Sequence, residues 1–314
     1  MCGIAGRICS PSGRVGSDLV ELMQAQRHRG SDSTGFGMYG ERRERGYVVR
    51  AVVDDRAQLS ALLDSFLAAT KNHGSDFLED PTWDELDQRH VSIRLVVDDP
   101  ADSIEGWLSD ADHISGFEIQ SVGRSLEIIK DLGDSYAVAD KHRVRDFEGT
   151  HGLANARMAT ESFVSPTASH PFWARPNPDI AIVHNGQLTN YYLLTARLQR
   201  QGYYFKTQND SEVIAVWLSD QMAAGSSLTE SLENSKSALD GCFTYILATV
   251  DTISFAKDRF AIKPLVVVSE PSGTMAVATE EQAIRKIYPG EVDVVNYDGP
   301  SQSHVWEAAA SVPA

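Results

Sequence analysis

The sequence has few cysteines. Its 314 residues contain three, Cys2, Cys9 and Cys242, and a small, odd number argues against a disulfide framework and is typical of a reducing compartment. The histidines stand alone, and no His or Cys pair has the spacing of metal ligands. We therefore expect no metal site. We also expect a fold stabilised by an apolar core, for which a hydrophobic content of 42% is ample.

Basic residues are also scarce. The 28 lysines and arginines face 44 acidic residues, for a net charge of -16, which argues against nucleic acid or an anionic membrane surface as a partner. No apolar run approaches the roughly 18 residues of a membrane span. The first ten residues, MCGIAGRICS, lack the basic and long apolar regions of a secretory signal. These features predict a cytoplasmic protein.

Hydrophobic periodicity predicts strands and helices along most of the chain. The residues 34–39 and 46–53 are expected to pair as a hairpin, with charged residues 41–45 at its tip. Further strands are expected at 3–9, 91–97, 117–122, 152–157, 180–183, 243–250, 253–257, 264–269, 275–278 and 292–297. Helices are expected at 17–27, 56–70, 101–111, 124–132, 189–201, 211–224, 228–240 and 280–287. Strands, then helices, then strands favour a layered α+β fold over alternating βαβ units.

The composition changes after Asp54, and the pattern of the first part resumes near Gly152. We therefore expect one main domain formed by residues 1–53 and 151–300. Residues 54–150 would be an inserted α+β subdomain. Residues 301–314 are expected to be a frayed tail.

Position 2 carries the first chemical signal. Methionine aminopeptidase removes Met1 when the second residue is small, so the mature chain would begin at Cys2. An α-amine with a pKa of about 7.7–8.0 can act as the base for the thiol of its own residue. The resulting thiolate is a strong nucleophile toward a carboxamide. Taken alone, Cys2 is better explained as an incidental buried cysteine.

Six motifs follow one another along the chain: MCGIAG at 1–6, RGSDS at 29–33, RMAT at 157–160, HNG at 184–186, NDSE at 209–212 and KDRFAIKPL at 257–265. In content and order they resemble the motifs of class II glutamine amidotransferases, which include glucosamine-6-phosphate synthase, amidophosphoribosyltransferase, asparagine synthetase and glutamate synthase. The resemblance covers residues 1–40 and 150–282. Ser31 replaces the usual proline, and Glu161 replaces the histidine or asparagine of many relatives, so the role of Glu161 stays open.

This resemblance implies the fold of N-terminal-nucleophile (Ntn) hydrolases, a four-layer αββα sandwich of antiparallel sheets. It also implies hydrolysis of L-glutamine to glutamate and ammonia through a thioester on Cys2. Asn185, through its side-chain amide, and Gly186, through its backbone N–H, would form the oxyanion hole. Such donors stabilise a tetrahedral intermediate by about 3–4 kcal/mol each. An ordinary Asn-Gly turn is the alternative for this pair.

The resemblance also assigns the substrate contacts. Arg157 would hold the α-carboxylate through its planar guanidinium, and Asp210 would hold the α-ammonium. Asp210 could instead cap a helix, or do both. Thr160 is expected to contact the substrate as well.

His170 is a candidate lining residue of the pocket, whereas His184 is better explained as a packed histidine. Arg29, Gly30, Ser31, Asp32 and Ser33 would form a loop that closes over bound glutamine, with Gly30 and Gly35 as hinges. Residues 257–263 are expected to brace a sheet edge or a subunit contact, and Cys9 and Cys242 to lie in the core.

Within the family, residues 157–162, the segment at 169–172 and the long insertion resemble the separate amidotransferase subunit of glutamate-synthase-like and N-methylglutamate-synthase-like complexes. That resemblance implies a hetero-oligomer with flavin-dependent synthase subunits. FMN and iron-sulfur clusters are then expected only in the partners, with no cofactor in this chain. Two alternatives stay open: a stand-alone Ntn cysteine amidase acting on another amide, and a catalytically idle subunit that senses glutamine.

Overall fold

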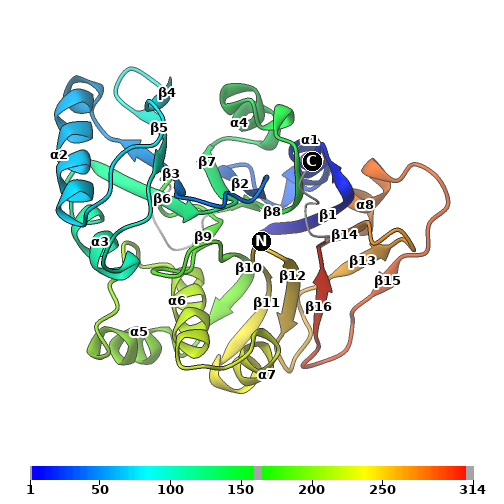
Figure 1. The fold of residues 1–314 in the computed structure, drawn as a ribbon. Coiled ribbons are helices and arrows are strands. Elements are labelled where there is room, and N and C mark those ends of the chain that lie inside the picture. Colours follow the sequence, from blue (N-terminus) through cyan, green and yellow to red (C-terminus); the bar gives the residue numbers. More distant parts are fainter. Residues whose placement is uncertain (1, 159–164, 309–314) are drawn as a thin grey trace.

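The computed structural model of the chain describes residues 2–158 and 165–308. A seven-stranded sheet forms its first inner layer (Figure 1), with the strand order β15-β13-β14-β1-β8-β2-β7 and antiparallel pairing throughout. Its strands are β1 (Gly3–Gly13), β2 (Ser33–Tyr39), β7 (Leu126–Leu132), β8 (Gly149–Arg157), β13 (Val266–Ser269), β14 (Met275–Ala278) and β15 (Val295–Asn296).

A five-stranded antiparallel sheet forms the second inner layer, in the order β16-β12-β11-β10-β9. Its strands are β9 (Phe172–Trp173), β10 (Ala181–Leu188), β11 (Gly241–Ala248), β12 (Thr252–Lys257) and β16 (Ser303–Glu307). The two sheets pack face to face because apolar residues alternate along the strands. In β1, Ile4 and Ile8 point toward the second sheet, whereas Ala5 and Cys9 point toward the helices.

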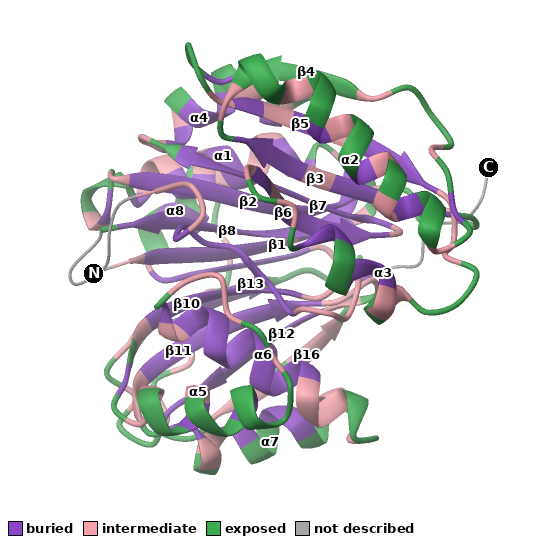
Figure 2. Ribbon diagram, turned by 90° about the vertical axis from the view of Figure 1, so that its left-hand side faces the viewer, coloured by how far each residue is buried: buried purple, intermediate pink, exposed green. Residues whose placement is uncertain are grey.

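Helices cover the outer face of each sheet (Figure 2). The seven-stranded sheet is covered by α1 (Val15–Ala25), α4 (Ser135–His142) and α8 (Glu281–Ile287). The five-stranded sheet is covered by α5 (Tyr191–Arg200), α6 (Asp210–Ala223) and α7 (Leu228–Ala238). The result is the expected α+β sandwich of two antiparallel sheets between two helical layers, in the order α-β-β-α.

A smaller unit adjoins one side of this sandwich. Its four-stranded sheet has the order β4-β5-β3-β6 and is packed against α2 (Leu59–Asn72) and α3 (Ile104–Ala111) through Phe66, Trp107 and Phe117. The strands are β3 (Tyr47–Val53), β4 (Thr82–Glu85), β5 (Val91–Val97) and β6 (Phe117–Gly123). Single turns of 3-10 helix occur at η1 (Arg27–Arg29), η2 (Arg56–Gln58) and η3 (Val144–Asp146). We call the residues 47–123 the small-sheet unit.

Three local predictions were wrong. Residues 34–39 and 46–53 do not form a hairpin, because β7 and β8 already occupy both edges of β2. Residues 124–132 are not a helix, because 126–132 form strand β7. Part of the expected frayed tail is strand β16, which pairs with β12 and stacks Trp306 on Phe255.

The borders of the insertion also differ from the expected ones at 53/54 and 150/151. The small sheet takes in β3, which precedes Asp54, whereas β7 and α4 belong to the main sandwich. Strand pairing over long sequence separations sets these borders, and local composition does not report it.

Candidate active site

The register of the seven-stranded sheet brings the first residues of the chain to the end of β8. Gly3 of β1 pairs with Ala156 of β8, so the preceding Cys2 lies beside Arg157. Both side chains line a pocket of ≈ 620 Å³. Two motifs that are more than 150 residues apart in the sequence therefore supply one wall of the same pocket.

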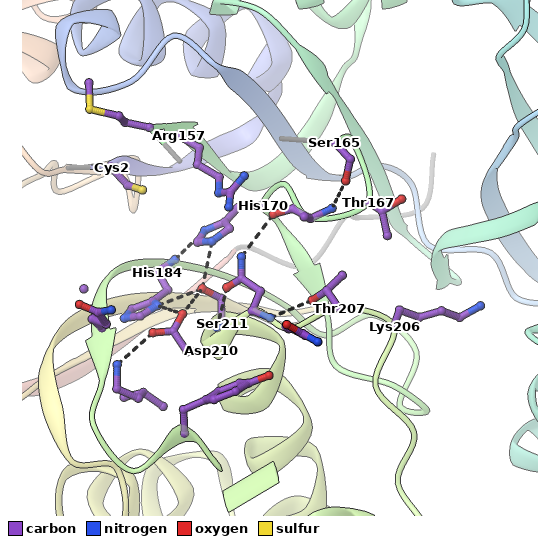
Figure 3. A pocket seen from close by; sticks show the side chains of 18 of the residues that line it. Cys2, Arg157, Ser165, Thr167, His170, His184, Lys206, Thr207, Asp210 and Ser211 are labelled. Atoms are coloured by element: carbon purple, nitrogen blue, oxygen red, sulfur yellow. Dashed lines mark hydrogen bonds and ion pairs between the residues drawn. The ribbon is translucent and has the colours of Figure 1, made fainter. Parts of the chain in front are cut away.

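The opposite wall comes from the five-stranded sheet and its helical layer. The end of β10 meets the first turn of α6, where the Leu188 N–H donates to Asp210 Oδ2 at 2.9 Å. Gly186, Leu188 and Asp210 line the pocket. Figure 3 shows Cys2 and Arg157 on one side, Asp210 on the other, and His170 between them. The segments 165–168 and 206–209 also contribute to the lining of the pocket.

The thiol of Cys2 is partly buried, and its surroundings have opposing effects on its pKa. Burial raises the pKa of Cys2, while a hydrogen bond from the Met158 backbone and the charge of Arg157 lower it by less. The net pKa is above the ordinary value of a cysteine. The thiol therefore needs a base before it can react, and the α-amine of an N-terminal Cys2 would be the nearest one covalently available.

Asp210 and Arg157 place opposite charges in the pocket. Burial alone would raise the pKa of Asp210, but His184 and the hydrogen bond from Leu188 outweigh it and lower the pKa to about 2. Burial lowers the pKa of Arg157, and the charges of Cys2, Asp32 and Asp210 offset part of that effect. A guanidinium remains protonated under such conditions. Arg157 and Asp210 thus place a cation and an anion on opposite walls of the pocket, and Lys206 adds a second cation to its lining.

Two histidines connect these walls through Ser211. His170 Nδ1 accepts a hydrogen bond from the His184 N–H at 3.2 Å, and its Nε2 lies 2.9 Å from Ser211 Oγ. Because Nδ1 accepts, we assign the proton of the neutral ring to Nε2. Burial, followed by the charges of His184 and Arg157, lowers the pKa of His170 well below its usual range. His170 lines the pocket and is neutral, so it adds no charge there.

His184 is buried within this network rather than free to act as a base. Its Nδ1 lies 2.9 Å from Ser211 Oγ and 3.6 Å from Asp210 Oδ1. The contact agrees with the packed role that the sequence suggests for His184. Sequence reasoning did not single out Ser211 and the Leu188 N–H, although Ser211 belongs to the NDSE motif.

Asn185 and Gly186 lie within strand β10, opposite Thr244 and Phe243 of β11, and not in a turn. Gly186 has φ of +154°, and a Cβ there would lie 2.1 Å from the Cys242 carbonyl oxygen, so only glycine fits. The Asn185 side chain is buried and does not line the pocket, and its Nδ2 has no hydrogen-bond partner among the described residues. A buried donor without a hydrogen-bond partner is uncommon in native structures.

The predicted lid, residues 29–33, lies against the ends of β1 and β8. Arg29 Nε donates to the Cys2 carbonyl at 3.1 Å, and the Asp32 N–H donates to the Arg157 carbonyl at 3.1 Å. Residues 29–33 are absent from the described lining of the pocket. Their position supports Cys2 and Arg157, and closure over a ligand stays a prediction.

The remaining predicted residues divide into three groups. Thr160 and Glu161 lie outside the described residues. Asp258, in the last motif, accepts hydrogen bonds from the Phe243, Phe260 and Ala261 backbones, so it holds the turn after β12 against β11. The helix cap is Asn209, whose side chain accepts from the Ser211 N–H, and Asp210 is the first helical residue, free to face the pocket.

Within residues 2–158 and 165–308, no group of three or more His, Cys, Asp or Glu side chains is arranged to hold a metal ion. Across the same residues, none of the helices has both the length and the apolar character needed to cross a membrane.

Comparison with known proteins places these features in a family. Residues 155–286 match the model of the glutamine amidotransferase domain. A Methanothermobacter thermautotrophicus protein that bears the name glutamine amidotransferase is 33% identical over 313 residues, which is 98% of this chain and 100% of that protein. The glutamine amidotransferase-like protein GlxB of Rhizobium meliloti is 30% identical over 311 residues, covering 98% and 95% of the two chains.

Solved structures support the fold. The glutamine phosphoribosylpyrophosphate amidotransferase of B. subtilis superposes with a TM-score of 0.58 at 18% identity. The match covers 96% of this chain but 49% of that one, so this chain spans about half the length of the solved relative. Together with the two relatives matched over nearly their whole length, these comparisons show that the chain belongs to the class II glutamine amidotransferases, enzymes with the Ntn-hydrolase fold.

Proposed function

We propose that this glutamine amidotransferase hydrolyses L-glutamine through a thioester on Cys2. The observation that carries the proposal is the convergence of the Cys2 thiol, the Arg157 guanidinium and the Asp210 carboxylate on one pocket. Arg157 would bind the α-carboxylate and Asp210 the α-ammonium. A peptide or acylated amide lacks one of these charges, so the pair selects a free amino acid.

The chemistry follows from the first residue of the processed chain. The α-amine takes the thiol proton, and the sulfur attacks the side-chain carbonyl carbon of glutamine. The Asn185 Nδ2–H and Gly186 N–H would stabilise the developing oxyanion. The C–N bond then breaks, and ammonia leaves with the proton returned by the ammonium. Water attacks the remaining γ-glutamyl thioester, which releases glutamate and restores the thiol.

We further propose that the ammonia passes to a flavin-dependent subunit of the glutamate-synthase-like or N-methylglutamate-synthase-like kind, which would carry FMN and iron-sulfur clusters. The motif resemblance supports this choice. The net charge of -16 argues against nucleic acid as a partner. Purification of the native complex followed by flavin absorbance tests it. Fast glutamine turnover by the isolated chain, unchanged by any co-purifying protein, would argue against the partner.

The catalytic assignment is tested by Cys2→Ala, with Cys242→Ala as the matched control. C2A should lose glutaminase activity by at least about 10³-fold, because the nucleophile is gone, whereas C242A should retain it. Mass spectrometry should show Met1 removed, and 6-diazo-5-oxo-norleucine should alkylate Cys2 alone. Ammonia release by C2A at the wild-type rate would refute the role of Cys2. Equal turnover of N-acyl amides would favour the stand-alone amidase, and retained Met1 would favour the idle subunit.

A further inference from the structure

The small-sheet unit reaches the substrate pocket through the end of α3. Asp112, the residue that follows α3, is buried, and its carbonyl oxygen accepts a hydrogen bond from Lys206 Nζ at 2.6 Å. The same Lys206 Nζ lies 3.0 Å from Asp112 Oδ1. Lys206 lines the pocket. An acidic group of the small-sheet unit is therefore paired with the segment 206–209 that forms part of the pocket wall.

Arg175 and Glu212 extend this contact into a four-membered charge network. Arg175 Nε lies 3.3 Å from Asp112 Oδ2, and Arg175 Nη1 lies 3.7 Å from Glu212 Oε1. Glu212 is almost fully buried and accepts from the Lys206 and Thr207 backbone N–H groups, each at 2.8 Å. The two cations and two anions balance one another, as buried charges must.

The network ends at Thr207 and Asn209, which precede Asp210 and fix the start of α6. The Asn209 N–H donates to Thr207 Oγ1 at 3.2 Å, and the Asn209 side chain caps α6. The Asn209 Nδ2 also donates to the Ala168 carbonyl at 3.3 Å. Displacement of Lys206 or Thr207 would therefore shift the cap of α6, and Asp210 is the first residue of that helix.

A second contact holds the segment 165–168, which also lines the pocket. Thr167, which lines the pocket, donates a hydrogen bond to Glu118 of β6. Gln120 Nε2 fixes the other carboxylate oxygen of Glu118 at 2.9 Å. The buried Lys130 Nζ of β7 donates to the Thr167 and Ser169 carbonyls at 3.1 and 2.9 Å. The segments 165–168 and 206–209 are thus both attached to residues between 112 and 130.

We propose that Asp112 is a positioning residue for glutamine binding, and that the small-sheet unit acts as a brace for the pocket wall through Asp112 and Glu118. The inference deepens the proposed function and rests on it, since it concerns how tightly the same pocket holds glutamine. Asp112 acts through Lys206 and does not contact the nucleophile. Its loss should therefore weaken substrate binding more than it slows the chemical step.

The test compares wild type, Asp112→Asn and Glu127→Gln in glutaminase kinetics. D112N keeps the shape of the side chain and removes its charge, which leaves Lys206 and Arg175 short of one anion. We expect the glutamine KM of D112N to rise roughly tenfold, a loss that corresponds to about 1.4 kcal/mol, with kcat within about twofold of wild type.

Glu127→Gln is the matched control, because Glu127 is buried to a similar degree and also joins the small-sheet unit to the main sandwich. It pairs with Arg50 at 2.7 Å and Arg94 at 3.2 Å, and it does not line the pocket. We expect both E127Q and D112N to lower the melting temperature. E127Q should leave KM at the wild-type value. If KM rose equally in D112N and E127Q, general destabilisation would explain the effect, and the proposal would be overturned.

The double variant Asp112→Asn with Lys206→Met shows whether the two residues act as one unit. If Asp112 works through Lys206, the single and double variants share the same KM. The proposal would be overturned if the KM of the double variant rose by the product of the two single effects. It would also be overturned if D112N left KM unchanged. If D112N does not fold, Lys206→Met alone must raise KM with kcat preserved. Wild-type protein without glutaminase activity would instead refute the proposed function.

Discussion

At the scale of single residues, the proposed function gives Asp210 the task of binding the α-ammonium of the substrate. Its pKa of about 2 keeps the carboxylate ionised at neutral pH. Asp210→Asn should keep the acceptor for the Leu188 N–H and remove the charge. We expect kcat/KM for glutamine to fall roughly 10- to 100-fold, the range for a lost charged hydrogen bond. 5-Amino-5-oxopentanoate, which lacks the α-amine, should be turned over equally by both proteins.

Asp134→Asn provides the control for this substitution. Asp134 caps α4, where its side chain accepts from the Ala137 N–H, and asparagine is an equally good cap. D134N should therefore match wild type on both substrates. If D210N kept the full preference for glutamine over the deaminated analogue, another group would have to bind the ammonium.

The sequence points to several residues of this site but not to the hydrogen bonds that connect them. Cys2, Arg157 and Asp210 stand in motifs with known chemistry, and they do line one pocket. The Leu188 N–H and the Ser211 hydroxyl could not be assigned, because their roles depend on how β10 meets α6 in space. A backbone N–H carries no mark in the sequence, and every strand residue has one.

At the scale of elements, the turn between α1 and β2 is fitted against the end of β8. A Cβ on Gly30 would lie 2.3 Å from the Arg157 carbonyl carbon and 2.4 Å from the Met158 nitrogen. Gly30→Ala should therefore push these segments apart. We expect it to lower the free energy of unfolding by about 1–3 kcal/mol, as overpacking does. Because Arg157 would move, kcat/KM for glutamine should also fall by more than about tenfold.

Gly290→Ala is the matched control, because no heavy atom lies within 4 Å of the Cβ that it would gain. Urea unfolding and glutaminase assays on G30A, G290A and wild type make the comparison. G290A should stay within about 0.5 kcal/mol of wild type. Full activity and stability in G30A would mean that the lid segment moves away from Arg157 without cost.

The elements that the sequence mispredicted share one cause. Residues 126–132, LEIIKDL, contain good helix formers with Glu127 and Lys130 three residues apart, which favours a helix locally. In the fold, Leu126 and Ile128 face one core cluster and Ile129 faces another, so both faces of the strand are buried. Pairing with β2 then outweighs local propensity. Strands bounded by clear turns, such as 91–97, were predicted to the residue.

At the scale of the whole molecule, His151 joins the two sheets of the sandwich. It lies on β8, is fully buried, and stacks on Tyr39 at 4.2 Å between ring centroids. Its Nε2 lies 2.7 Å from the Thr249 carbonyl and its Nδ1 lies 2.8 Å from Thr150 Oγ1. Tyr39 Oη crosses the same gap and donates to the Ala248 carbonyl at 2.8 Å. Only the neutral ring can both donate to Thr249 and accept from Thr150.

The buried ring should make the stability of the sandwich depend on pH. Burial lowers the pKa of His151 to about 4, although the bond to the Thr249 carbonyl opposes the shift, and the unfolded value is about 6.5. Between these values the unfolded chain binds more protons than the folded one. The free energy of unfolding therefore rises with pH across this window, and the contribution is complete above about pH 6.5.

His151→Gln should remove this dependence, because glutamine can keep the bond to the Thr249 carbonyl and does not titrate. The gap between the two pKa values corresponds to about 3 kcal/mol, so wild type should lose roughly 2–3 kcal/mol more than H151Q between pH 7 and pH 4.5. H151Q should be the less stable protein at pH 7, where the stacked ring packs best. Urea unfolding at several pH values measures both profiles, and other buried histidines such as His170 cancel in the difference. If the free energies of unfolding of wild type and H151Q changed with pH in parallel, protonation of His151 would not destabilise the packing between the two sheets.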